Sequence, residues 1–164
     1  MERTKKLAVA ALLTALALVL SYLEALVPLS IAVPGVKLGL PNLVVIFALY
    51  RLRPRTAALI SLLRVVLVSV LFGSALSLAY SAAGAVLSFL VMFCLKKSGI
   101  FGCVGVSVAG AVSHNLAQIL TAALLLETGR LAWYFPVLCL SGTVAGICIG
   151  LVSALLVKRV DLKL

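Results

Sequence analysis

The sequence predicts an all-α integral membrane protein, a compact bundle of six transmembrane helices that forms one domain over residues 1–164. Two features of the composition lead to this fold class: 65% of the residues are hydrophobic, and only 11% are charged. A third is the arrangement of the apolar residues in long runs, divided by short clusters of lysine and arginine. Soluble domains keep roughly 25% of their residues charged, and a small one leaves much of its surface in water. A mean hydropathy of +1.32 therefore indicates that lipid surrounds the chain.

Six apolar runs define the predicted spans, since a spanning helix needs about 20 mainly apolar residues. The runs cover residues 7–29, 39–52, 56–72, 76–95, 103–126 and 131–157. The first follows a charged start but is too long for a signal peptide, so we predict an uncleaved helix. The second is short for a full span, and Pro41 near its start suits the first turn of a helix.

Small residues at four-residue spacing predict close packing of the last two spans, because such residues let helix backbones approach each other in lipid. The sixth span carries Gly142, Gly146, Gly150 and Ala154, and the fifth carries Gly105, Ala109, Ser113, Ala117 and Thr121. The first span has a shorter row, Ala8, Ala11 and Ala15, which faces either the bundle or a partner.

The lysines and arginines predict the orientation, because loops on the cytoplasmic side carry an excess of them. With the N-terminus inside, the inner segments hold Arg3, Lys5, Lys6, Arg51, Arg53, Arg55, Lys96, Lys97, Lys158, Arg159 and Lys163. The outer segments hold only Lys37 and Arg130, and Arg64 lies within a span. We therefore expect both termini in the cytoplasm and a multi-pass protein of the cell membrane, the inner membrane of a bacterium.

The net charge of +10 does not indicate nucleic-acid binding, because the basic clusters are short and lack the interleaved aromatic residues of a base-stacking surface. The four cysteines form no Cys-x-x-Cys pair and the chain has one histidine, so we expect no metal site. No sequence motif for a bound cofactor occurs, and we expect none.

Catalysis by this chain alone is not expected. The only acidic residues are Glu2, Glu24, Glu127 and Asp161, scattered along the chain, whereas prenyl-diphosphate synthesis needs clustered carboxylates to hold magnesium. The chain has no phosphate-binding loop for ATP and no Ser-His-Asp set. We therefore assign no catalytic residues.

Arg64 is the charged residue deepest in a predicted span, between Arg55 and Gly73. An arginine at the centre of a bilayer costs about 2.5–3.5 kcal/mol on insertion scales. Either its guanidinium pairs with backbone carbonyls or reaches an interface, or it faces a cavity that receives an anionic or carbonyl-bearing ligand. The second interpretation makes Arg64 a candidate substrate-binding residue.

Further polar residues lie in and near the fifth and second spans. His114 and Gln118 are four residues apart and share a helix face, with Asn115 on the adjoining one. They either form interhelical hydrogen bonds or line a ligand site. Lys37 and Asn42 flank the start of the second span, and we include both as candidate substrate-binding residues at the mouth of a cavity.

Two short motifs resemble a known family. Residues 36–42 read Val-Lys-Leu-Gly-Leu-Pro-Asn, and residues 113–118 read Ser-His-Asn-Leu-Ala-Gln. They resemble proteins labelled "heptaprenyl diphosphate synthase component I" or the Gx transporter family, over nearly the whole chain. Ala117 stands where that family is expected to carry glycine, a departure that affects only close packing there.

That family in turn resembles the substrate-binding S components of energy-coupling factor (ECF) transporters. The resemblance implies a six-helix subunit that captures a small vitamin-like or isoprenoid- or quinone-related precursor. We further expect the loop of residues 30–38 to act as a lid over the ligand. It implies a membrane coupling protein and two ATPase subunits as partners, with Ala11 and Ala15 at the contact. The alternatives are a non-catalytic membrane accessory subunit of heptaprenyl diphosphate synthesis, which serves the quinone side chain, and a purely structural bundle.

Overall fold

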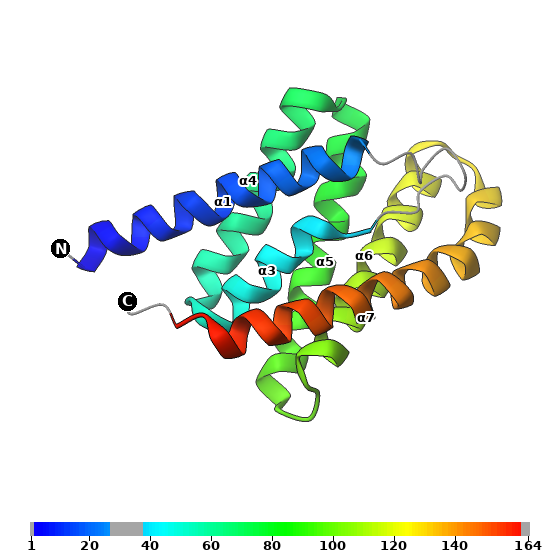
Figure 1. The fold of residues 1–164 in the computed structure, drawn as a ribbon. Helices are drawn as coiled ribbons and strands as arrows, with labels where there is room; N and C mark the ends of the chain where they lie inside the picture. Colours follow the sequence, from blue (N-terminus) through cyan, green and yellow to red (C-terminus); the bar gives the residue numbers. More distant parts are fainter. Residues whose placement is uncertain (1, 27–37, 162–164) are drawn as a thin grey trace.

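The computed structural model describes residues 2–26 and 38–161, and within them the chain is all-helical (Figure 1). Six α-helices are present, with a short 3-10 helix, η1, before the last. They are α1 (Glu2–Leu26), α3 (Leu40–Arg51), α4 (Pro54–Phe72), α5 (Ala75–Ser98), α6 (Cys103–Leu125), η1 (Gly129–Tyr134) and α7 (Phe135–Arg159). The predicted fold class, an all-α bundle of six helices, is confirmed.

Five of these helices, all except α3, are long and apolar enough to cross a membrane. Large apolar side chains on their outer surfaces stay exposed, among them Leu12, Val70, Leu124, Leu140 and Leu155. An apolar exterior suits hydrocarbon and would be costly in water. The chain is therefore an integral multi-pass membrane protein.

The last helix begins later than the sequence suggests. The predicted sixth span starts at residue 131, but residues 129–134 form η1 and α7 begins at Phe135. Pro136 lies in the first turn of α7, where its missing N–H leaves no helical hydrogen bond unmade.

Helix α3 is the buried centre of the bundle. It lies between α1 and α7 in Figure 1 and also contacts α4. Its residues from Val44 to Leu49 are all buried, as expected of a helix that is apolar on every side. With 12 residues it is about 18 Å long, so the helix by itself does not reach across a hydrocarbon core of about 30 Å, and the predicted second span is not a full-length transmembrane helix. Space is therefore left beyond one of its ends.

Helices α6 and α7 approach each other through the predicted glycines of α7. A Cβ atom built on Gly146 would lie 2.8 Å from the Cα of Val108, and one on Gly150 would lie 2.8 Å from the Cα of Val104. The row of small residues predicted on the fifth span, Gly105 to Thr121, is not the one that meets these glycines. The residues of α6 that meet these glycines include Val104, Val108 and Ala111, which lie on the adjoining face of the helix.

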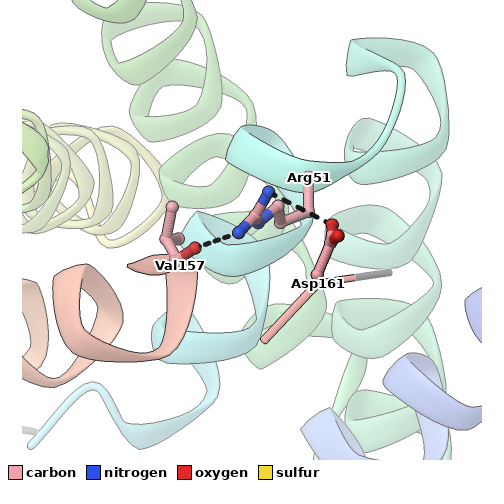
Figure 2. Close-up of polar contacts among 3 residues, drawn as sticks. All are labelled: Arg51, Val157 and Asp161. Carbon is pink, nitrogen blue, oxygen red and sulfur yellow. Dashed lines mark hydrogen bonds and ion pairs between the residues drawn. The ribbon is translucent and has the colours of Figure 1, made fainter. Parts of the chain in front are cut away.

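The C-terminal ends of α3, α5 and α7 lie together. The Nη2 atom of Arg51 donates to the carbonyl oxygen of Val157, and its Nη1 lies 3.8 Å from a carboxylate oxygen of Asp161 (Figure 2). The Nζ atom of Lys96 donates to the carbonyl oxygen of Leu49 at 2.6 Å. Cations here bind carbonyls that have no intrahelical partner, which stabilises helix C-termini. Three of the predicted inner segments therefore share one end of the bundle; the side of the membrane that this end faces stays a prediction.

Candidate functional site

A cavity of about 380 Å³ lies inside the bundle, and all six α-helices contribute residues to its wall. It contacts the first turn of α3, at Pro41 and Asn42, and so lies at the end of that helix opposite to Arg51. Its polar lining consists of Ser21, Glu24, Asn42, Arg64, Ser69, Ser77, Ser81, Ser107, His114 and Asn115. Polar side chains are thus gathered within an exterior that is apolar, which is typical of a ligand site in a membrane protein.

Arg64 projects from α4 into this cavity. Only 9% of the residue is exposed, and its Nε atom is buried without a hydrogen-bond partner in the described part of the chain. Among the described residues no backbone carbonyl accepts from this Nε atom, and the role of Arg64 in substrate binding stays a prediction. A buried donor without a partner is costly, and a ligand that accepts its hydrogen bond would remove that cost.

Glu24 is the opposite charge in the wall. Its Oε1 atom accepts a hydrogen bond of 2.8 Å from the backbone N–H of Gly39, which precedes α3. Gly39 has a φ of 74°, a left-handed conformation that glycine adopts without strain. Glu24 thereby joins the end of α1 to the start of α3 and also acts electrostatically on the Arg64 guanidinium.

Two glycines make room for the polar residues of α6. A Cβ atom on Gly142 would lie 2.6 Å from the Nδ2 atom of Asn115, which donates to the carbonyl oxygen of Leu138 at 2.8 Å. A Cβ atom on Gly84 of α5 would lie 2.9 Å from the imidazole of His114. Both polar side chains can therefore sit between helices and still face the cavity.

The structure brings four of the six predicted binding residues to the cavity: Asn42, Arg64, His114 and Asn115. Gln118 is not among the lining residues, and its Cγ atom packs instead against Gly84. Lys37 and the predicted lid, apart from Leu38, lie outside the described residues. The predicted partner residues Ala11 and Ala15, together with Ala8, are exposed on the outer face of α1.

Sequence reasoning missed five serines and did not include Glu24 among the candidate binding residues. Ser21, Ser69, Ser77, Ser81 and Ser107 come from four helices and meet only in the folded bundle. Isolated serines are common in transmembrane helices because their hydroxyls bond to the preceding turn, as that of Ser21 does to the carbonyl oxygen of Ala17. No spacing rule would have gathered them.

The described residues contain no group of three or more His, Cys, Asp or Glu side chains that could hold a metal ion. What the wall offers is one arginine, one carboxylate, an imidazole, two amides and several hydroxyls. Groups of these kinds can hold a polar molecule through charge and hydrogen bonds.

Residues 13–156, most of the chain, match the family described as heptaprenyl diphosphate synthase component I. The chain belongs to this family. Comparisons with curated proteins and with solved structures found no match. Membership of the heptaprenyl diphosphate synthase component I family confirms the first part of the resemblance seen in the motifs. The further likeness to S components stays a prediction.

Proposed function

We propose that this chain is the substrate-binding membrane subunit of an importer of the energy-coupling factor type, and that it is not an enzyme on its own. The observation that carries the proposal is the cavity: a polar site, walled by all six α-helices, inside a bundle whose exterior is apolar. Such a site holds a small molecule away from lipid. An importer of this kind draws its energy from partner ATPases, in keeping with the lack of an ATP-binding motif in the sequence.

The place of the cavity supports capture from outside. It lies at the end of α3 opposite to the cluster of Arg51 and Lys96. If basic residues mark the cytoplasmic side, the cavity is in the outer half of the membrane. Under this proposal both termini are cytoplasmic.

The outer face of α1 is the proposed contact with the coupling protein. Ala8, Ala11 and Ala15 leave a smooth, exposed strip there, and small residues let a partner helix come close. Helix α1 is also the least buried of the five long helices, and its first turns extend past its neighbours in Figure 1. This face of α1 is thus available to a partner, while Ser21 and Glu24 of the same helix line the cavity.

The second candidate is an accessory subunit of heptaprenyl diphosphate synthesis, which the description of the family favours. That role would require the chain to hold a prenyl diphosphate for a soluble catalytic partner. At about 380 Å³ the cavity lies near the lower end of the range of small-molecule sites, roughly 300–1,000 Å³, so it suits a compact molecule better than a prenyl diphosphate of seven isoprene units. The importer is therefore the first choice.

Affinity purification tests the partnership. We expect tagged protein, co-expressed with the coupling protein and ATPases of its own organism, to retain them. The double variant Ala11→Leu, Ala15→Leu should lose them and still bind ligand. Ala79→Leu, a single enlargement of the same kind on the exposed side of α5, is the control and should retain them. Loss of partners in both variants, or in neither, would contradict the assignment of this face.

Uptake measurements separate the two candidates. Deletion of the gene should stop the entry of an external compound if the chain is an importer subunit. If it serves prenyl-diphosphate synthesis, deletion should lower long-chain quinone even when precursors are supplied inside the cell. The second result would replace the importer with the accessory subunit.

A further inference from the structure

The cavity wall contains two formal charges among its described residues, and they are opposite. Arg64 of α4 is buried, with its Nε atom unpartnered, and Glu24 of α1 is half-buried. The carboxylate of Glu24 has one described hydrogen bond, to the N–H of Gly39, although a carboxylate offers about four lone-pair sites. Both groups therefore have unused capacity toward the cavity.

We infer that the substrate is a small zwitterion, a molecule with one anionic group for Arg64 and one cationic nitrogen for Glu24. This inference rests on the proposed function, since it names the substrate class of the same site. A ligand of this kind pairs both protein charges and adds no net charge to a site enclosed by apolar helices. Burial of charge is inexpensive only when each charge is paired and hydrogen-bonded.

A simple anion fits the wall less well. It would pair with Arg64 but bring a second negative charge close to Glu24, and repulsion between like charges is strong where water is excluded. A prenyl diphosphate fits worse, because its head group carries more than one negative charge and finds one arginine among the described lining residues. The charge pattern thus disfavours the substrate that the family description suggests.

The rest of the cavity sets the size and shape of the zwitterion. At about 380 Å³ the cavity lies near the lower end of the roughly 300–1,000 Å³ of small-molecule sites, which favours a compact ligand. Gly142, Ala145 and Gly146 form a smooth strip of α7 on one side, and Val65 and Val68 supply apolar surface from α4. A compact apolar or aromatic body between the two charged groups therefore suits this space.

Charge-neutral variants test the inference before the ligand has been identified. Glu24→Gln keeps a side-chain oxygen that can accept from the N–H of Gly39, so the bundle should fold. The probe is the polar-metabolite extract of the host, separated by ion exchange into zwitterionic, anionic and cationic fractions. We expect only the zwitterionic fraction to raise the melting temperature of the purified protein. The active compound, isolated from it, should bind at least about tenfold more weakly to Glu24→Gln and to Arg64→Gln.

An anionic substrate predicts a different pattern, in which binding to Glu24→Gln is unchanged or tighter while Arg64→Gln still loses it. That pattern of binding would overturn the inference. The inference would also be overturned if only the anionic fraction raised the melting temperature, or if no fraction raised it. Co-purification with the ATPases is measured separately. If the protein retains the ATPases but binds an anionic ligand, only the zwitterion inference is refuted. If it binds a zwitterion but does not retain the ATPases, only the importer proposal is refuted.

Discussion

The contact between α6 and α7 can be tested by Gly146→Val. In the structure a Cβ atom at position 146 would lie 2.8 Å from the Cα of Val108, about 0.6 Å closer than the 3.4 Å at which ordinary contact begins. The atom that it meets belongs to the backbone, so no side chain can turn away to relieve the overlap. The two helices must separate, and every contact along them must adjust.

The expected loss of stability is about 1–3 kcal/mol, the usual cost of forcing extra carbon atoms into a packed interior. Helix propensity has little effect on this loss of stability, because the helix propensities of valine and glycine differ by only a few tenths of a kcal/mol. For a chain of this size each kcal/mol lowers the melting temperature by about 2–4 °C. We therefore expect a decrease of roughly 2–12 °C.

Size-exclusion chromatography after heating, in mild detergent, measures the fraction of protein that stays monodisperse. Gly129→Val is the matched control, because a Cβ atom there meets no atom within 4 Å. It should melt close to the unchanged protein. If Gly146→Val and Gly129→Val melt at the same temperature, helices α6 and α7 do not approach each other as closely as the structure shows.

Three further outcomes follow from particular contacts. Gly84→Ala should weaken ligand binding several-fold with little loss of stability, since its Cβ atom would displace the His114 side chain and not backbone; titration calorimetry with the isolated ligand checks this, and unchanged affinity would remove His114 from the site. Gly142→Ala should also weaken binding, because its Cβ atom would meet the amide of Asn115, and a variant that binds normally would show that this amide is dispensable. Arg51→Met should lower stability by about 1–2 kcal/mol through loss of the charged hydrogen bond to the last turn of α7, and equal melting temperatures would show that this bond contributes nothing.

The sequence alone was sufficient to predict that lipid surrounds the chain, where the helices lie, and much of the close packing of α7. Lipid requires every backbone N–H and C=O group to be bonded within the protein, so long apolar runs leave helices as the simple solution. Run length and flanking charges then locate the spans within a few residues. The glycines of α7 were also predictable, because a strict four-residue repeat places them on one helix face.

Other features were decided only by the tertiary structure. Glu24 and Arg64 are forty positions apart in the sequence, and nothing local indicates that α1 and α4 place them on one cavity. Gln118 shares a helix face with His114, yet the neighbouring α5 covers it at Gly84. The five serines came from four different helices and carried no joint signal.

The physical reason is the range of the interactions involved. Hydropathy and periodicity act between a residue and its solvent or its own helix, so they can be read along the chain. A binding site depends on the rotation and depth of each helix against the others, which many small packing contacts determine together. The sequence by itself thus determined a membrane bundle of six helices, and tertiary packing determined that an arginine and a glutamate meet on one cavity within it.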